Sequence, residues 1–305
     1  FLNEVNESWI VDRFRSEWYQ YNAEISETKI SQADVIWILS PWTWKKIPKN
    51  QLKNKPVLCS IHHLEHELKS TKGYKDFLER DKYVSYYHVL SEKSKKELQK
   101  LTNKDIFVAQ FWINQNIFFH IENKKLLREK YGLNHDDYLI GSFQRDTEGK
   151  DLVSPKLIKG PDIFIEILKN NYLEKENLKI VLTGKRRNYV ISELEKLNIK
   201  YKYFEMINFE SLNELYNILD LYLITSRKEG GPQQVQEAAI TKTPILSTDV
   251  GIVDLLLNKK SIYSSGTYKN AEVDTSYPFH QIQRLKIPQG FDDFISIFKK
   301  VLNES

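Results

Sequence analysis

The 305-residue sequence has a single cysteine, Cys59. One cysteine excludes internal disulfides and metal sites built from cysteine alone, and it suits a reducing compartment such as the cytoplasm. No apolar run approaches the ~20 residues that a membrane-spanning helix needs. An excess of one charge is also missing, because 45 Lys and Arg balance 41 Asp and Glu to leave a net charge of +4. This mild charge predicts no nucleic-acid partner.

Glycine is scarce in the first third of the chain, where Gly73 is the only one before residue 112. Tryptophan has the opposite distribution, since all six (the last is Trp112) lie at or before that residue. Two regions with such different compositions indicate two domains. We predict domains over residues 1–112 and 113–290, and a terminal helix over 291–305 that packs back on the first domain.

Helical and strand patterns alternate along both halves. Short apolar, β-branched runs bounded by polar or turn residues predict buried strands, and apolar spacing of three to four residues predicts helices. This alternation is typical of an α/β protein with mostly parallel sheets, in which ligands bind at the carboxyl ends of the strands. The predicted strands are 34–39, 56–61, 82–90, 105–109, 138–143, 178–183, 221–225 and 243–247. The predicted helices are 8–19, 92–101, 161–169, 188–197, 212–219, 254–257 and 291–302.

The most informative stretch is residues 226–251, Ser-Arg-Lys-Glu-Gly-Gly-Pro-Gln-Gln-Val-Gln-Glu-Ala-Ala-Ile-Thr-Lys-Thr-Pro-Ile-Leu-Ser-Thr-Asp-Val-Gly. It follows a predicted strand. Glycines 230 and 231 allow the backbone to approach a ligand closely. Pro232 is expected to start a helix, so that the backbone amides of Gln233 and Gln234 are free to bind an anion such as phosphate.

Two carboxylates flank this expected phosphate site. Glu229 lies in the loop, and Glu237 lies about one and a half turns into the helix. Carboxylates repel phosphate, but they accept hydrogen bonds from sugar hydroxyls. Phosphate, ribose and sugar together are what a nucleotide sugar presents. Without that context, the two glutamates are ordinary surface charge at a helix start.

The pattern resembles the donor-binding motif of glycosyltransferase family four, in the glycosyl transferases group 1. Glu229, seven residues, Glu237 and then 243–251 match its Glu-Gly-x-Pro variant. Residues 141–145 and 159–162, which contain Lys159-Gly160, resemble the strand and loop that precede it, and 111–118 resemble the linker between domains. The resemblance implies the GT-B fold, with two Rossmann-like domains and a cleft between them, the N-terminal domain here being unusually small. It implies a retaining glycosyltransferase, with hexose as the transferred sugar and polysaccharide biosynthesis as its setting.

The resemblance also implies a role for each matching residue. Glu237 would hold the ribose, and Glu229 the donor sugar. Arg145 and Lys159 would neutralise the diphosphate as it leaves, with Arg186 or Arg187 as substitutes for Arg145. The remaining donor contacts would come from Gly184, Arg186, Gly231, Pro232, Gln233 and Gln234. His62 would lie near the reacting sugar, with His63 and His66 as competitors.

Two features depart from the family. The chain has no glycine-rich loop near its start, and residues 3–8 take the place of that loop. The resemblance therefore does not identify the residues that bind the acceptor. No Asp-x-Asp occurs either, so we predict no metal and no cofactor, with the nucleotide sugar as co-substrate. Arg145 and Lys159 would then supply the positive charge that a metal gives in other enzymes.

Residues 35–64 contain no acid, but they carry tryptophans beside lysines. Such a cluster is either a solvated loop beside a core strand or a surface for anionic lipid headgroups or acidic glycans. The second interpretation predicts a cytoplasmic protein that contacts the inner face of a membrane. The contact residues would be Trp42, Trp44, Lys45, Lys46 and Lys49.

The sequence is consistent with three functions to different degrees. The expected one is transfer of a sugar to a glycan or lipid-linked glycan acceptor. A catalytically degenerate nucleotide-sugar binder on the same fold is the alternative. An NAD-dependent dehydrogenase is disfavoured, because no Gly-x-Gly-x-x-Gly follows a strand.

Overall fold

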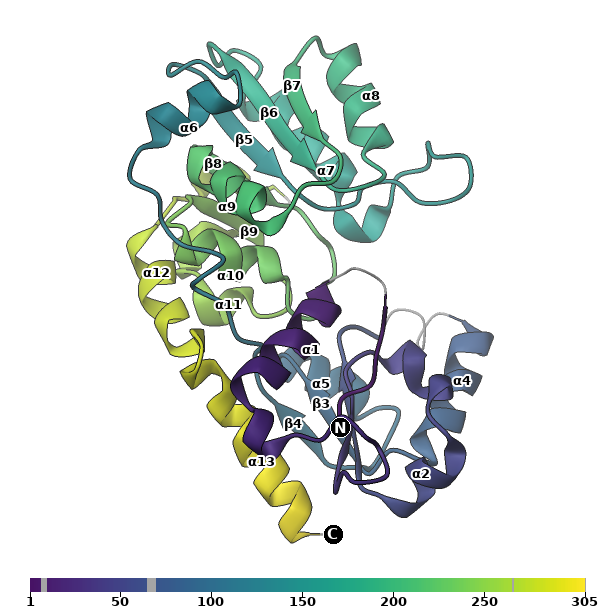
Figure 1. Cartoon of the computed structure of the whole chain (residues 1–305). Coiled ribbons are helices and arrows are strands. Elements are labelled where there is room, and N and C mark those ends of the chain that lie inside the picture. The colour runs from purple at the N-terminus through teal and green to yellow at the C-terminus, as the bar shows by residue number, and fades with distance from the viewer. Residues whose placement is uncertain (7–9, 65–69, 265, 305) are drawn as a thin grey trace. The chain divides into compact units, whose positions relative to one another are not determined.

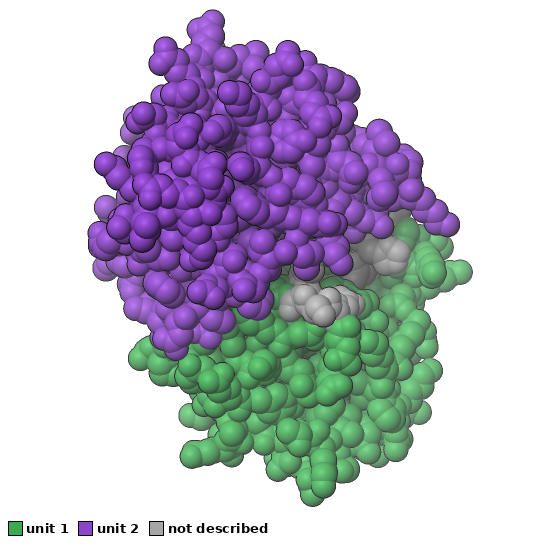
Figure 2. Space-filling view, turned by 45° about the horizontal axis from the view of Figure 1, so that its top comes forward, with its two compact units in different colours: residues 1–112, 287–305 green, residues 113–286 purple. Residues whose placement is uncertain are grey.

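The computed structural model describes residues 1–6, 10–64, 70–264 and 266–304. Trp9, His66 and the start of the predicted helix 8–19 lie outside the described residues. By its contacts the chain divides into two compact units, which Figure 2 shows in different colours. Unit 1 comprises residues 1–112 and 287–305, and unit 2 comprises residues 113–286.

Unit 1 is built on a parallel sheet in the order β1-β2-β3-β4. Leu2 adds an isolated parallel bridge beside Trp37 of β1. In chain order its elements are α1 (Ile10–Tyr21), η1 (Ala23–Ile25), β1 (Ile36–Ile38), η2 (Pro41–Lys46), α2 (Lys49–Asn54), β2 (Val57–Ile61), α4 (Thr71–Asp81), β3 (Tyr86–Val89), α5 (Glu92–Leu98), β4 (Ile106–Val108), η7 (Gln289–Phe291) and α13 (Asp292–Asn303).

The side-chain alternation of β1 separates the two faces of this sheet. Ile36 and Ile38 join one apolar cluster with residues of α2, α4 and α5. Trp37 points to the other face, where its ring lies 5.3 Å from Trp18 of α1 and 5.0 Å from Phe294 of α13. The rings of Trp18, Trp37 and Phe294 thus form part of an aromatic layer between this sheet and helices α1 and α13. Figure 1 shows the course of these two helices.

Unit 2 is built on a parallel sheet in the order β10-β9-β8-β5-β6-β7. Its elements are α6 (Lys124–Lys130), β5 (Tyr138–Ser142), η3 (Leu157–Lys159), α7 (Pro161–Asn171), β6 (Leu178–Thr183), α8 (Asn188–Lys196), β7 (Lys200–Phe204), α9 (Phe209–Ile218), β8 (Leu221–Ile224), α10 (Gln233–Ile240), β9 (Ile245–Thr248), α11 (Val253–Leu256), η4 (Lys259–Ser261), β10 (Ile262–Tyr263), η5 (Tyr268–Asn270), α12 (Ser276–Ile282) and η6 (Gln283–Leu285).

The strand order of unit 2 is that of a doubly wound, dinucleotide-binding sheet. Helices α7 and α8 cover one face through a cluster that includes Phe164, Leu168 and Leu194, together with Leu223 of β8. The strand order reverses between β5 and β8, which are neighbours in the sheet. The loops that leave these two strands therefore diverge, and ligands of such sheets bind in the crevice between them.

The α/β fold class with parallel sheets is confirmed, but some expected elements are wrong. The strand predicted over 82–90 begins only at Tyr86, because α4 and its closing turn occupy the residues as far as Val84. Pro232 does not start the helix as expected. It is the N-cap of α10, with extended backbone (ψ 114°), and the helix begins at Gln233.

Candidate functional site

The candidate site lies at the carboxyl ends of β5 and β8 in unit 2. The chain leaves β5 through residues 143–160, and it leaves β8 through residues 225–232. Gly160 joins the two loops. Its φ is +62°, and a Cβ at this position would lie 1.8 Å from the carbonyl oxygen of Thr225. Only glycine allows this approach, which places Lys159 directly beside the end of β8.

Side chains from both loops hold the backbone at Lys159. Gln144 donates a hydrogen bond from Nε2 to the Lys159 carbonyl oxygen at 2.8 Å, and the Thr225 hydroxyl donates to the same oxygen at 3.3 Å. The Arg227 amide donates to the Ile158 carbonyl at 2.8 Å. These bonds fix the point from which the Lys159 side chain extends.

Lys159 and Glu229 form an ion pair across the two loops, with 2.5 Å between Nζ and Oε1. The Ser226 hydroxyl donates a second hydrogen bond to the same carboxylate oxygen at 2.8 Å. The side chains of the pair are 25% and 13% exposed, so solvent reaches both. Two of the predicted site residues are therefore in direct contact, although 70 residues separate them in sequence.

Arg145 adds a second cation to this loop region. Its Nε donates to the Thr147 carbonyl at 2.8 Å, which leaves the terminal nitrogens of the guanidinium for other partners. Burial and the nearby charge of Arg186 lower the pKa of Arg145. Arg145 and Arg186 are thus close enough to repel each other, which favours an anion at this place.

Lys156 is a further cation here, and sequence reasoning missed it. Burial, followed by the charges of Lys159 and Arg145, lowers the pKa of Lys156. The sequence signal for Lys156 was its position three residues before Lys159. In the structure Lys156 immediately precedes the 3-10 turn η3, and Lys159 is the last residue of that turn.

Gly184 and Arg186 follow β6. Gly184 has a φ of +90° and open space where a Cβ would be, so it leaves room beside the site. Arg186 is half-buried and donates to the Gly149 carbonyl at 3.1 Å. Arg187, the predicted substitute for Arg145, is buried instead. It forms an ion pair with Asp146 (Nε to Oδ2, 2.6 Å) and is therefore part of the core rather than the surface of the site.

The start of α10 is the third part of the site. Gly251 packs against Gly230, and a Cβ on Gly251 would lie 2.6 Å from the Gly230 carbonyl oxygen. Gly231 and Pro232 then lead into the helix, whose first amides belong to Gln233 and Gln234. A free amide is intrinsic to the first turn of any helix. Gln233 Oε1 is buried and has no hydrogen-bond partner among the described residues.

Glu237 lies on the next turn of α10 and is 5% exposed. Tyr216 of α9 donates a hydrogen bond from its hydroxyl to Oε2 of Glu237 at 2.9 Å. Tyr216 in turn packs against Tyr222 of β8 and Phe143, with ring centroids 5.2 and 5.0 Å away. Sequence reasoning missed Tyr216, although its aromatic ring lies on the apolar face of a predicted helix.

His62 belongs to unit 1. It follows β2, and its Nε2 donates to the Leu39 carbonyl at 2.7 Å. Its ring stacks on Phe111 with 5.7 Å between centroids. Burial lowers the pKa of His62 to about 4, so the ring is neutral at pH 7.

The prediction of a lipid-facing surface is wrong for one residue, Trp44, and acidic side chains neutralise two of the lysines in it. Trp44 is only 1% exposed, because its ring packs into the core of unit 1. The acids that the segment itself lacks come from α4: Lys45 pairs with Asp76 at 2.5 Å, and Lys49 pairs with Glu79 at 3.4 Å. Trp42 remains 49% exposed, and Lys46 donates to a backbone carbonyl.

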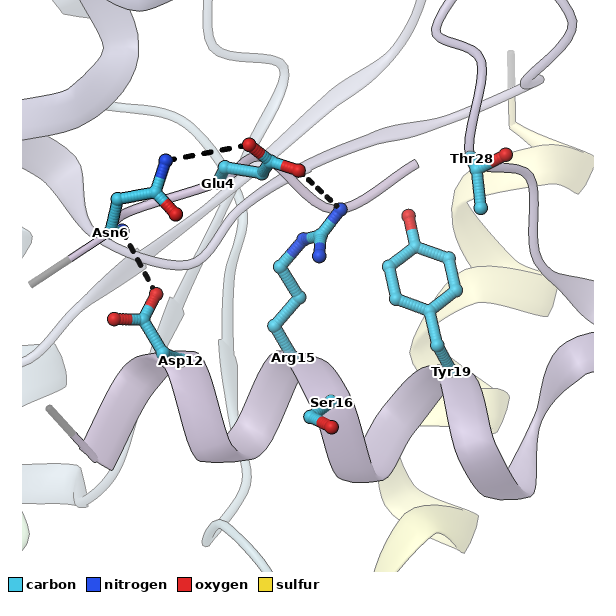
Figure 3. A pocket seen from close by; sticks show the side chains of 7 residues that line it. All are labelled: Glu4, Asn6, Asp12, Arg15, Ser16, Tyr19 and Thr28. Atoms are coloured by element: carbon cyan, nitrogen blue, oxygen red, sulfur yellow. Dashed lines mark hydrogen bonds and ion pairs between the residues drawn. The ribbon is translucent and has the colours of Figure 1, made fainter. Parts of the chain in front are cut away.

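Unit 1 also has a polar hollow of about 380 Å³ along α1 (Figure 3). Within it Arg15 contacts Glu4 at 3.4 Å, and Asp12 accepts from the Asn6 amide at 3.0 Å. The Tyr19 hydroxyl donates to the Glu27 carbonyl at 3.0 Å. Over the described ranges, no helix is long and apolar enough to cross a bilayer.

Two parallel sheets of this kind, the second in dinucleotide-binding order, define the class of α/β protein with two Rossmann-like domains. The structure is similar to sucrose-phosphate synthase from Thermosynechococcus elongatus, with a TM-score of 0.71 and 12% identity, covering 97% of this chain and 78% of that one. It is also similar to Anabaena HepE in complex with UDP and glucose (0.68, 14%, 88% and 78%) and to a glycosyltransferase from Rickettsia africae (0.65, 17%, 99% and 85%). The fold is therefore GT-B, as predicted.

The sequence comparisons concern unit 2. Residues 123–261, a little under half of the chain, match the family model described as Glycosyl transferases group 1, the group that the sequence resembles. Uncharacterized protein 356 of Sulfolobus islandicus rod-shaped virus 1 is 30% identical over 141 residues. That match spans 44% of this chain and 38% of the viral protein.

Proposed function

We propose that this protein is a glycosyltransferase that binds a nucleotide sugar on unit 2 and transfers the sugar, a hexose, to a glycan or a lipid-linked glycan. The observation that carries the proposal is the Lys159–Glu229 pair where β5 and β8 diverge. A cation for phosphate and a carboxylate for sugar hydroxyls lie side by side there. The family match over residues 123–261 supports this assignment, as does the fold shared with HepE, which was crystallised with UDP and glucose.

In this proposal each loop binds one part of the donor. Glu237, held by Tyr216, accepts hydrogen bonds from the ribose hydroxyls. Glu229 accepts from hydroxyls of the donor sugar, beside the backbone of Gly231 and Gln233. Pro232 and Gln234 complete the turn, and Gly184 and Arg186 border the nucleotide. Glu229 must release Lys159 in part when the donor binds, because a hydroxyl and the ammonium compete for Oε1.

In the chemical step, the side chains of this protein supply positive charge to the leaving diphosphate. The bond between the anomeric carbon and the diphosphate oxygen breaks with its electron pair on the oxygen, so the leaving diphosphate gains negative charge. Cations already in place at that oxygen stabilise the transition state by several kcal/mol. Arg145 and Lys159 have this role in our proposal, without a metal ion. The oxygen of the acceptor hydroxyl forms the new bond to the anomeric carbon with retention, and its proton passes to the leaving diphosphate.

The acceptor side belongs to unit 1 in this proposal. Neutral His62 has one ring nitrogen engaged by Leu39, so the other is available to accept a hydrogen bond from a sugar hydroxyl. A lipid-linked acceptor would bring the cytoplasmic protein to the inner face of a membrane. Trp42, which is exposed, and Lys46 would be the contact residues in that case.

A thermal-shift panel of UDP-, GDP-, ADP- and CDP-sugars tests donor binding. A cognate donor at 100 times its dissociation constant should stabilise the protein by about 2.7 kcal/mol. Glu237→Ala should abolish the shift and Lys159→Ala should reduce it. Glu166→Ala and Lys169→Ala, both on the exposed surface of α7, are matched controls that should respond as the wild type does. A wild type that no sugar nucleotide stabilises would refute the proposal.

A nucleotide-sugar binder without transfer activity on the same fold is the second candidate. Donor hydrolysis without acceptor, or transfer to any glycan, separates the two candidates. A protein that binds a donor tightly but neither hydrolyses nor transfers it would be the binder.

A further inference from the structure

Residues 146–156 form a hairpin that returns Lys156 to the site. The Lys156 amide donates to the Asp146 carbonyl at 2.7 Å, and the Glu148 amide donates to the Ser154 carbonyl at 2.9 Å. An antiparallel bridge joins Thr147 to Pro155 between these two bonds. In Figure 1 the loop between β5 and α7 extends beyond α7 and α8 before it returns. The hairpin thus places Lys156 beside Arg145 at its base.

The charges around Lys156 are unbalanced. Glu229 is already paired with Lys159 at 2.5 Å. Within the part of the chain that the structure describes, neither an ion pair nor a hydrogen bond engages the Lys156 ammonium, and its side chain is half-buried. Burial and then the charges of Lys159 and Arg145 lower the pKa of Lys156, while the smaller effects of Glu229 and Glu148 raise it. A half-buried ammonium among like charges is unfavourable unless an anion occupies the space between them.

We infer that Lys156 is a third cation for the diphosphate of the donor, brought by the hairpin to the group that Arg145 and Lys159 also contact. This inference rests on the proposed function and deepens it. Lys159 shares its charge with Glu229, so Lys156 and Arg145 supply the charge that is not already balanced. The ligand class is a nucleoside diphosphate, and Lys156 recognises its phosphates rather than its base or ribose.

The test compares two lysines of the same hairpin by isothermal titration calorimetry. Lys156→Gln removes the proposed contact, and Lys150→Gln removes an exposed lysine at the tip of the hairpin. The probes are UDP, GDP, ADP and CDP, together with the nucleoside of whichever binds the wild type most tightly. We expect Lys156→Gln to weaken binding of that nucleoside diphosphate roughly tenfold, the usual size of one charge-assisted hydrogen bond. Lys150→Gln should bind it as the wild type does, and Lys156→Arg should recover most of the affinity.

The nucleoside separates a phosphate contact from a structural effect. Lys156→Gln should bind the nucleoside as the wild type does, because no phosphate is present. Equal losses for nucleoside and nucleoside diphosphate, or no loss for either, would overturn the inference while leaving nucleotide binding intact. A wild type that binds none of the four diphosphates would overturn the proposed function, and the inference with it.

Discussion

The hydroxyl of Tyr216 donates a hydrogen bond of 2.9 Å to Oε2 of Glu237, so that a residue of α9 sets the orientation of a carboxylate on α10. Both side chains are buried, and burial raises the pKa of the Tyr216 hydroxyl well above its usual value, with a smaller contribution from the nearby Glu237 carboxylate. The tyrosine therefore stays protonated and remains a donor at every accessible pH. The hydrogen bond from Tyr216 therefore holds the Glu237 carboxylate in one orientation.

Tyr216→Phe should weaken nucleoside diphosphate binding by about three- to tenfold, because Glu237 loses the donor that holds it. The ring packing against Tyr222 and Phe143 stays, and the lost bond to a charged group should cost about 1.5–3 kcal/mol of stability. Calorimetric titration with the cognate diphosphate measures the affinity. Tyr263→Phe is the matched control, since it removes another buried hydroxyl, bonded to the Ile224 carbonyl at 2.7 Å. Equal affinities for the two variants would contradict the role assigned to Tyr216.

Gly160→Ala should both destabilise unit 2 and displace Lys159. The new Cβ would overlap the Thr225 carbonyl oxygen, and the residue would keep a φ of +62° that alanine adopts reluctantly. Strain and overlap together should cost roughly 2–4 kcal/mol. Gly132→Ala provides the control, because its φ is +63° and only the end of the Lys202 side chain is nearby, at 3.6 Å. Urea unfolding followed by far-ultraviolet circular dichroism would refute the argument if both variants lost equal stability.

Much of unit 2 could be predicted from sequence because buried parallel strands are continuous apolar runs. Residues 178–183 are such a run, and the structure has β6 at those residues. The edge strand β7 was not predicted, because it lacks such an apolar run. Its sequence, Lys-Tyr-Lys-Tyr-Phe over Lys200–Phe204, is half exposed and alternates in polarity, so it lacks the apolar run that marks a central strand.

The candidate site could be predicted only in part. Lys159, Glu229 and Glu237 stand out because local motifs surround them. Their partners come from distant segments: Lys159 finds Glu229 70 residues away, and Glu237 finds Tyr216 21 residues away. The lysines beside Trp44 are a similar case, since the acids that neutralise Lys45 and Lys49 come from α4. The composition of one sequence segment does not show which charges from other segments will lie beside it in the folded protein.

Arg187 should prove structural rather than ligand-binding. Its guanidinium pairs with Asp146 and also donates to the Ser142 carbonyl at 2.6 Å, tying together the ends of β5 and β6. Arg187→Met should cost about 3–5 kcal/mol, because it leaves Asp146 buried and unpaired. The double variant Arg187→Met, Asp146→Leu should recover much of that loss. A double variant no more stable than the single one, in urea unfolding at pH 7, would argue against the ion pair as the cause.

Unit 1 should lose stability as the pH falls below 7. His88 is fully buried: it contacts the Ser60 hydroxyl at 2.8 Å through Nδ1 and the Ala109 carbonyl at 2.9 Å through Nε2. Burial lowers the pKa of His88 to about 4, against about 6.5 for an unfolded histidine. Between these two values the unfolded chain binds a proton that the folded chain does not, so stability falls as the pH falls. From pH 7 to pH 5 this should cost unit 1 about 2 kcal/mol for His88, and a similar amount for His62.

His88→Gln should therefore reduce the loss of stability between pH 7 and pH 5 by about 2 kcal/mol, whatever its effect at pH 7 alone. Tryptophan fluorescence during urea unfolding is the measurement, because all six tryptophans lie at or before residue 112 and report on unit 1. His135→Gln, on the exposed surface of unit 2, controls for loss of a histidine as such and should leave the pH dependence unchanged. If His88→Gln keeps the full wild-type pH dependence, the buried ring is already charged in the folded protein at pH 5, and burial does not hold its pKa down.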